Sequence, residues 1–325
     1  MHLRVRGFRA PRNEAIRPKN EFIDVPMNQR LTLPIALLLT VPPLMWAGNA
    51  VVGRAVAELI PPMTLNFFRW VIAFAILLPL TWRVLKPQSS VWANWKRYAV
   101  LGLLGVGCYN ALMYLALHTS TALNVTLVGA SMPIWMLSTG AMFFNQRITR
   151  MQVAGAILSI VGVLVVLSRG QLAWLVDVHF VPGDFYIILA SVAWAFYSWL
   201  LSQPKDAPEI RSDWASFLMA QIIFGLGWSG ALAGSEWALT NASISWGWPL
   251  MAALLYVALG PALLAYRCWG LGVQRAGPAI AGFFSNLTPL FAAVLSAAFL
   301  GELPQTYHAV AFLLIAGGIV VSARK

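Results

Sequence analysis

Residues 132–135 read MPIW, and 156 residues further along the chain residues 288–291 read TPLF. Two more pairs of similar motifs follow in the same order, FNQR (144–147) with FLGE (299–302) and GVLV (162–165) with GGIV (317–320). The offset falls from 156 between the prolines to 155 between Phe144 and Phe299, so one residue was gained or lost between them. The similarity runs from about 117 to 167 and returns from about 272 to the C-terminus, which indicates an internal duplication.

The composition of the chain assigns it to the membrane proteins. Hydrophobic residues make up 59% of the 325 residues and charged residues only 10%, and the mean hydropathy is +0.72. A soluble domain would have to hide this apolar area from water, whereas a bilayer accepts it in runs of about 20 residues. We therefore expect an all-α integral membrane protein.

The apolar residues fall into ten runs, each long enough to cross most or all of a bilayer core about 30 Å thick. The runs are 33–52, 63–82, 98–117, 122–144, 151–167, 185–201, 214–233, 249–271, 279–300 and 307–321. The predicted organisation is a basic, disordered tail at 1–30, a first five-helix repeat at 31–169, a connecting loop at 170–184 and a second five-helix repeat at 185–325.

The basic residues predict the orientation. When Lys and Arg are counted in alternate connections, 18 fall on one side and only Arg54 and Arg169 on the other, with Arg69 and Arg267 inside predicted helices. Because Lys and Arg are enriched on the cytoplasmic side, both termini are expected in the cytoplasm. This asymmetry also accounts for the net charge of +11, so nucleic-acid binding is not needed to explain it.

Each predicted half contains five helices, and an odd number places the second half upside down relative to the first. Inverted-topology repeats of this kind are typical of secondary transporters, whose substrate site lies near the bilayer midplane where the halves meet. The sequence therefore predicts a carrier that works by alternating access.

A set of residues in the first half resembles a known family. The set comprises Trp46, Ala47, Gly48 and Asn49, then Arg69 after Pro61 and Pro62, then Asn110, Tyr114, Ala116 and Leu117, and then Pro133. In this order they resemble the EamA branch of the drug/metabolite transporter superfamily, and the chain is similar to its bacterial exporters of amino acids, including aromatic ones. The resemblance implies a central cavity lined by helices 1, 3, 4, 6, 8 and 9, with helices 5 and 10 set aside. It departs from the family at Arg147, where an acidic residue is common and where the second copy has Glu302.

Pro133 and Pro289 are the predicted hinges, because proline leaves the carbonyl four residues earlier without its helical donor. The freed carbonyls belong to Gly129 and Ser285. Beside a cavity they can bind a substrate ammonium, and in a packed bundle a neighbouring helix can satisfy them. The sequence leaves both interpretations open.

Polar and aromatic residues at helical spacing predict the substrate-binding faces, since residues three or four apart share one side of a helix. The two freed carbonyls and the surroundings of Arg267 add further candidates. The candidate residues are Trp46, Asn49, Asn110, Tyr114, Asn124, Gly129, Ser131, Trp135, Trp194, Tyr266, Arg267, Ser285 and Asn286. Each of the asparagines either lines a cavity or forms a hydrogen bond between helices.

Charged residues inside the predicted helices are few. No Asp or Glu falls within the ten runs, which favours a facilitator or coupling through another group. Arg267, close to Tyr266 and Trp269, is the candidate for a substrate carboxylate, whereas Arg69 is expected to be structural. The two cysteines and the four histidines are dispersed, so neither a metal site nor a cofactor is predicted.

These patterns together predict a multi-pass transporter of the cell inner membrane that exports a small zwitterionic metabolite, either as a monomer or as a homodimer. An aromatic and polar cavity suits a neutral or aromatic amino acid. One alternative is efflux of drugs or cations, although the usual acidic counter-residue is missing. The other is a lipid-modifying membrane enzyme, for which a cluster of His, Asp or Glu would be expected.

Overall fold

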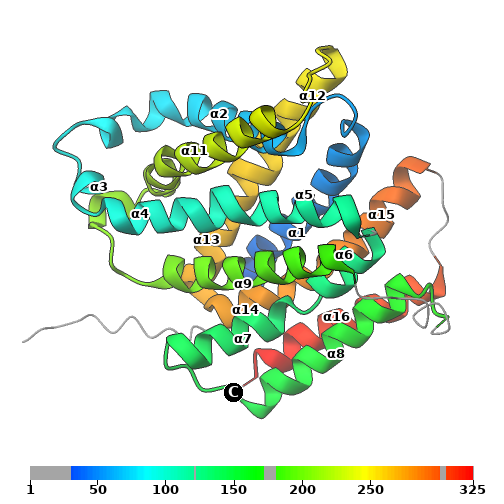
Figure 1. The fold of residues 1–325 in the computed structure, drawn as a ribbon. Helices are drawn as coiled ribbons and strands as arrows, with labels where there is room; N and C mark the ends of the chain where they lie inside the picture. Colours follow the sequence, from blue (N-terminus) through cyan, green and yellow to red (C-terminus); the bar gives the residue numbers. More distant parts are fainter. Residues whose placement is uncertain (1–30, 121, 172–180, 301–304, 325) are drawn as a thin grey trace, which may run out of the picture.

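The computed structural model describes residues 31–120, 122–171, 181–300 and 305–324, and every regular element within these ranges is helical (Figure 1). The longer α-helices are α1 (Leu33–Ala55), α2 (Pro62–Thr81), α4 (Trp95–Leu101), α5 (Tyr109–Thr119), α6 (Ala122–Gly129), α7 (Met132–Phe143), α8 (Arg150–Leu167), α9 (Pro182–Ser202), α11 (Trp214–Leu239), α12 (Trp248–Val257), α13 (Ala265–Ala276), α14 (Pro278–Phe284), α15 (Thr288–Leu300) and α16 (Thr306–Ser322). Two single turns, α3 (Ser90–Ala93) and α10 (Pro208–Arg211), lie in connections. The predicted tail at 1–30 and most of the predicted loop at 170–184 lie outside the described residues.

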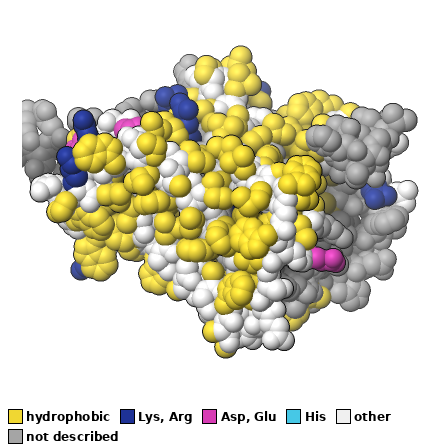
Figure 2. Space-filling model, turned by 90° about the horizontal axis from the view of Figure 1, so that it is seen from above, with side chains coloured by type: hydrophobic (Ala, Val, Ile, Leu, Met, Phe, Trp, Pro, Cys, Tyr) yellow, Lys and Arg dark blue, Asp and Glu magenta, His cyan; other side chains and the backbone are white. Residues whose placement is uncertain are grey.

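The described residues form nine helical stretches that are long and apolar enough to cross a membrane, and α16 is a shorter apolar helix of 17 residues. Large apolar side chains such as Leu80, Met142 and Leu313 are exposed. Figure 2 shows hydrophobic side chains over much of the described part of one face, with the charged side chains mostly towards its margins. Soluble monomers rarely expose so extensive an apolar surface. The all-helical membrane fold is therefore confirmed for the described part of the chain.

Four spans are interrupted by irregular turns. A π-helical segment, η2 (Gly102–Cys108), joins α4 to α5, and another, η4 (Ala258–Leu264), joins α12 to α13. A two-residue turn separates α6 from α7, and a 3₁₀ turn, η5 (Ser285–Leu287), separates α14 from α15. A further 3₁₀ turn, η1 (Trp82–Leu85), ends α2. The runs predicted at 122–144 and 279–300 are thus each two helices.

The sequence of these elements recurs along the chain at a constant spacing. Elements of the same type begin 156 residues apart, at Gly102 and Ala258 for the π-helical segments, Tyr109 and Ala265, Ala122 and Pro278, Met132 and Thr288, and Arg150 and Thr306. The duplicated motifs of the sequence therefore correspond to a recurrence of local structure.

Helices α8 and α16 form the most extensive helix pair and lie side by side at one edge of the bundle (Figure 1). A Cβ atom built on Gly155 would lie 2.6 Å from the carbonyl oxygen of Gly318, and one built on Gly318 would lie 2.7 Å from that of Gly155. Only glycine permits backbones to approach this closely. Elsewhere α2 packs on α11, α5 on α9 and α1 on α13, and α9 is the most buried span.

The start of α2 is capped by a distant helix. Pro61 at the N-cap position has no side-chain acceptor, and the carboxylate of Glu236 from α11 replaces it. It accepts hydrogen bonds from the backbone nitrogens of Met63 (3.0 Å) and Thr64 (2.9 Å) and from the Thr64 hydroxyl (2.8 Å). A negative group there also interacts favourably with the helix dipole, so Glu236 joins α2 to α11.

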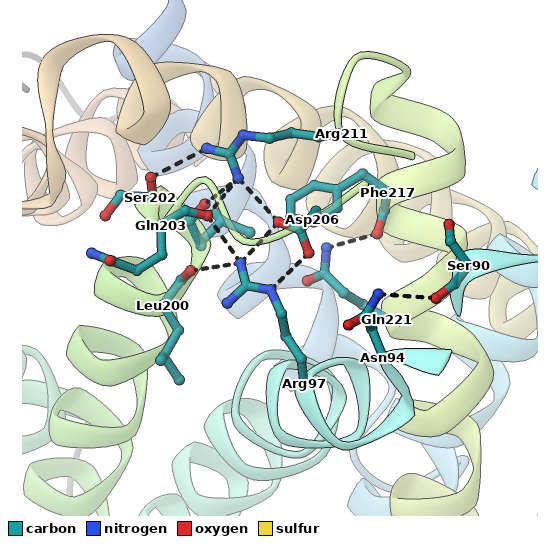
Figure 3. A network of polar contacts seen from close by, with 11 residues as sticks. Ser90, Asn94, Arg97, Leu200, Ser202, Gln203, Asp206, Arg211, Phe217 and Gln221 are labelled. Atoms are coloured by element: carbon teal, nitrogen blue, oxygen red, sulfur yellow. Dashed lines mark hydrogen bonds and ion pairs between the residues drawn. The ribbon is translucent and has the colours of Figure 1, made fainter. Parts of the chain in front are cut away.

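A buried carboxylate joins the elements at the other end of α11. Asp206 accepts two hydrogen bonds from Arg97 of α4, at 2.7 and 2.8 Å, and one from Arg211 of α10 at 3.1 Å (Figure 3). Both guanidinium groups also donate to carbonyls at the end of α9, including that of Gln203. Burial lowers the pKa of Arg211, and the charge of Asp206 opposes that shift. The Asp206 network therefore ties α4, α9 and α10 together.

Candidate functional site

Trp194 of α9 is the centre of a group of aromatic rings in the middle of the bundle. Its side chain is buried, and five rings from α1, α5, α9 and α13 lie within 5.5 Å of its ring, measured between centroids. These rings belong to Trp46 (5.3 Å), Tyr109 (4.9 Å), Tyr197 (4.9 Å), Tyr266 (5.5 Å) and Trp269 (5.5 Å). We call these six residues the aromatic cluster. Edge-to-face and tilted arrangements of this kind stabilise aromatic groups beyond simple burial.

The polar atoms of the cluster are held by specific partners. Tyr197 donates to Gln221 Oε1 at 2.9 Å, Trp269 donates to Ser198 Oγ at 3.1 Å, and the Tyr266 hydroxyl donates to the carbonyl oxygen of Gly105. Because these three buried donors are satisfied, the rings of Tyr197, Tyr266 and Trp269 are held in orientation. A substrate at this position would meet preorganised aromatic faces.

The π-helical segment η2 allows the cluster to form. Its sequence, GLLGVGC, contains three glycines, and a Cβ atom at Gly105 would lie 2.6 Å from the ring of Tyr197. In the matching segment η4, Pro261 removes a backbone donor, which favours a local change of helical register. π-Helical turns are frequent at functional sites, and these two adjoin the cluster.

Arg69 and Asn110 lie beside the aromatic cluster. Arg69 is only 1% exposed, and its Nη1 donates to Asn110 Oδ1 at 3.3 Å. Trp70, the next residue, packs edge-to-face on Tyr266 with 5.0 Å between centroids. Asn66, one turn earlier on α2, donates to the carbonyl of Val106 in η2 at 3.1 Å. The second and third spans therefore bring polar groups to the edge of the rings.

The break before Pro133 has its own hydrogen bonds. The backbone nitrogens of Ile134 and Trp135 both donate to the carbonyl of Ser131, and the Trp135 ring nitrogen donates to Ser131 Oγ at 2.9 Å. A Cβ atom on Gly129 would have no atom within 4 Å. Gly129 therefore borders open space at the turn, and Ser131 and Trp135 form a local pair.

The corresponding break before Pro289 differs. It is a 3₁₀ turn, and Asn286 donates from Nδ2 to Ser159 Oγ of α8 at 2.9 Å. The hydroxyl of Ser285 has no hydrogen-bond partner. Asn286 thus contacts α8, which contributes no ring to the aromatic cluster.

The remaining candidate residues lie apart from the cluster. Asn49 is buried and its Oδ1 has no partner, Tyr114 packs in a separate apolar group with Leu250 and Leu254, and the side chain of Asn124 lies outside the described residues. Arg267 is exposed, with its guanidinium carbon 4.8 Å from the ring centroid of Trp214. The structure thus brings Trp46, Trp194 and Tyr266 together, with Asn110 beside them, and leaves the others elsewhere.

Two hollows lie at opposite ends of α11. One, of about 30 Å³, is lined by Tyr197 and Tyr266 of the cluster and by Gln221 and Arg267. The other, of about 610 Å³, is lined by Met63, Leu115 and Glu236 among others. Met63 precedes Arg69 by six residues on α2, and Leu115 follows Asn110 by five on α5. The smaller hollow thus borders the aromatic cluster, and neither hollow is lined by Arg69, Asn110 or Trp194.

The sequence interpretation missed three rings of the cluster, those of Tyr109, Tyr197 and Trp269. Helical spacing carried a signal for two of them, since Tyr197 follows Trp194 by three residues and Trp269 follows Tyr266 by three. Among the described residues, no group of three or more His, Cys, Asp or Glu side chains could hold a metal ion.

Comparisons with known proteins give a consistent result. The profile of the EamA-like transporter family matches residues 33–168 and again residues 181–324. An uncharacterized transporter of Archaeoglobus fulgidus is 26% identical over 308 residues, covering 92% of this chain and 99% of its own. The aromatic amino acid exporter YddG of Ancylobacter novellus is 23% identical over 288 residues, which cover 86% of this chain and 93% of the exporter. A solved crystal structure with 22% identity has a similar fold, with a TM-score of 0.67 over 89% of this chain and 96% of that one.

Proposed function

The chain belongs to the EamA-like transporter family, and from this premise we propose that it exports small metabolites, namely aromatic or other neutral amino acids, by alternating access. It is a multi-pass integral membrane protein of the cell inner membrane. The observation that carries the proposal is the aromatic cluster around Trp194, which borders the smaller hollow and lies next to the buried Arg69 and Asn110. A relative named as an aromatic amino acid exporter supports the choice of substrate class.

The proposed architecture is ten transmembrane helices in a five-plus-five inverted repeat, with both termini in the cytoplasm. The 156-residue recurrence of the helical elements and the two separate family matches support the repeat. The excess of Lys and Arg on one side supports the orientation. Reporter fusions at the C-terminus test it, because an alkaline phosphatase fusion that is active would place that end outside the cytoplasm.

In this proposal the aromatic cluster is where the substrate side chain stacks. Trp46, Trp194 and Tyr266 supply ring faces from α1, α9 and α13, and Asn110 supplies a polar group from α5. The breaks before Pro133 and Pro289 act as hinges, and Gly129 and Ser285 lie at these breaks. In carriers built from inverted repeats, broken helices form the substrate site, and one repeat rocks against the other to open the site alternately to the two sides.

Counterflow in proteoliposomes tests the proposal. We expect saturable uptake of labelled tryptophan, phenylalanine or leucine into vesicles preloaded with the same amino acid, and uptake without an imposed pH gradient. Absence of saturable uptake for every amino acid tested would refute the substrate class. Strict dependence on the gradient would refute a facilitated mechanism while leaving the substrate class intact. Preferential transport of a lipophilic cation would instead identify a drug carrier.

Matched tryptophan variants locate the site. Trp194→Ala should abolish counterflow, whereas Trp248→Ala, at a side chain that is 80% exposed, should not. Asn110→Ala tests the polar face of α5, and Trp135→Ala tests that of α7. Size-exclusion chromatography of each variant shows whether lost transport reflects lost folding. Normal transport by folded Trp194→Ala protein would exclude the cluster as the site.

A further inference from the structure

Arg69 carries a positive charge into the interior of the bundle. It lies two turns inside α2, it is 1% exposed, and its guanidinium carbon is 5.5 Å from the ring centroid of Trp70. Placing a cation at a helix centre in a membrane costs about 2.5–3.5 kcal/mol on insertion scales. A position that tolerates this cost requires a compensating interaction.

The described part of the chain supplies no negative charge to Arg69. Both ion pairs within that part are made by Asp206, with Arg97 and Arg211. The hydrogen bond from Arg69 to Asn110 is long, at 3.3 Å, and goes to a neutral oxygen. A buried cation without a counter-charge is strongly destabilising, because desolvation is not repaid by an ionic contact.

Several donors around Arg69 are also unused. Arg69 Nε, Asn110 Nδ2 and Trp70 Nε1 are buried without a hydrogen-bond partner. These are three N–H donors from two helices, and one belongs to the guanidinium group, whose fork matches a carboxylate. A carboxylate accepts several hydrogen bonds and carries the missing charge. The group that fits this set of donors is therefore an anion, and a carboxylate fits best.

The neighbouring rings define what the rest of the ligand must be. The Trp70 ring contacts Tyr266, which in turn contacts Trp194 at the centre of the cluster. The Arg69 guanidinium carbon lies 5.5 Å from the centroid of the Trp70 ring, and that ring lies 5.0 Å from the ring of Tyr266. A ligand with its carboxylate at Arg69 would therefore place an apolar or aromatic side chain against the rings.

Arg267, the residue favoured by sequence position, is placed less well for this role. Its side chain is exposed rather than enclosed by the bundle, and its guanidinium group stacks on Trp214 at the small hollow. An exposed guanidinium group needs no counter-charge from a substrate.

We propose that Arg69, together with Asn110, binds the carboxylate of the transported substrate, so that the carrier selects molecules with a free carboxylate and an apolar or aromatic side chain. This proposal rests on the transport function proposed above. Because the two hollows do not reach Arg69, the ligand arrives there when one side of the bundle opens.

Competition against labelled tryptophan tests the proposal on the unmodified protein. Indole-3-propionate, which keeps the carboxylate and lacks the ammonium, should compete. Tryptophan amide and tryptamine, which lack the carboxylate, should compete on the order of 10- to 100-fold less well, as expected for losing hydrogen bonds to a charged group. Equal competition by tryptamine and indole-3-propionate would overturn the proposal without needing any variant.

Variants then assign the selectivity to a residue. In Arg69→Gln the KM for tryptophan should rise by about the same 10- to 100-fold factor that separates the competitors, and the preference for carboxylates over amides should disappear. Arg69→Lys should retain part of the preference, and Arg267→Gln should keep all of it. If the role of Arg69 were purely structural, Arg69→Gln would lower the thermal stability of the protein and leave the competition profile unchanged. If Arg69→Gln does not fold, Asn110→Ala provides the same comparison.

A binding measurement separates this proposal from the transport function. The protein in detergent should be stabilised against heat by indole-3-propionate and not by tryptamine, and Arg69→Gln should lose that difference. If this holds while no amino acid is transported, the carboxylate site stands and the transport proposal fails. If amino acids are transported but thermal stabilisation and competition ignore the carboxylate, only the role of Arg69 is refuted.

Discussion

The Tyr266 hydroxyl donates a hydrogen bond to the carbonyl oxygen of Gly105, a residue 161 positions earlier in the chain. Gly105 lies in η2, and Tyr266 follows the end of η4 by two residues. The bond therefore links the two spans that contain π-helical segments, at the edge of the aromatic cluster.

Tyr266→Phe should keep the ring contacts and lose this link. The buried carbonyl of Gly105 would then lack its donor, so we expect a loss of about 1–3 kcal/mol in stability. Thermal unfolding in detergent measures it, and transport of tryptophan should weaken as the cluster loosens. An unchanged melting temperature would show that the carbonyl finds another donor.

Gly105→Ala should disturb the cluster directly. The added methyl would lie 2.6 Å from the Tyr197 ring, so either that ring or η2 must move. We expect reduced yield of folded protein and a melting temperature lowered by several degrees, consistent with overpacking costs of about 1–3 kcal/mol. Gly227→Ala is the matched control, because its Cβ would have no atom within 4 Å. Equal behaviour of the two variants would contradict the packing seen at η2.

Asp206→Asn should destabilise the end of the bundle that holds the network of Figure 3. The variant leaves Arg97 and Arg211 without their shared counter-charge, and breaking a buried pair typically costs about 3–5 kcal/mol. Limited proteolysis within residues 203–213 should become faster. Glu209→Gln, at a fully exposed neighbour, should have no such effect. Equal proteolysis of both variants would mean that the connection is held by its backbone contacts alone.

Glu236→Ala should fray the start of α2. Two backbone donors and the Thr64 hydroxyl would lose their acceptor, and a lost cap costs about 1–2 kcal/mol. Hydrogen exchange at residues 63–66 reports the effect locally. Glu58→Ala, an exposed residue of the same hollow, serves as the comparison. Unaltered exchange in Glu236→Ala would show that water replaces the carboxylate.

Much of the fold could be predicted because hydropathy alone marks the spans. The breaks were harder to predict. Pro261 gives a visible reason for η4, but η2 has none beyond its glycines, since the run 102–108 is apolar on all sides and carries no periodicity that would distinguish a π-turn from an α-turn. The role of Glu236 as a cap for α2 was likewise missed, because the backbone that it caps lies 172 residues away in the sequence.

The site was predicted in part. Trp46 and Trp194 were identified from spacing and Tyr266 as a neighbour of Arg267, but contact between rings on α1, α9 and α13 depends on how distant helices pack. The same limit applies to the two arginines. Both stand inside apolar runs, and only tertiary packing decides that Arg69 is enclosed and Arg267 is exposed.

The glycine contact between α8 and α16 has a consequence for how the protein is made. Residues 306–322 leave the ribosome after all the other described helices, so α8 has to wait for its main partner until α9 to α15 have been synthesised. During that interval the backbone around Gly155 lacks the close contact with Gly318 that it makes in the complete fold. A chain truncated before residue 306 would therefore be a substrate for membrane quality control, even though all residues of the aromatic cluster would be present.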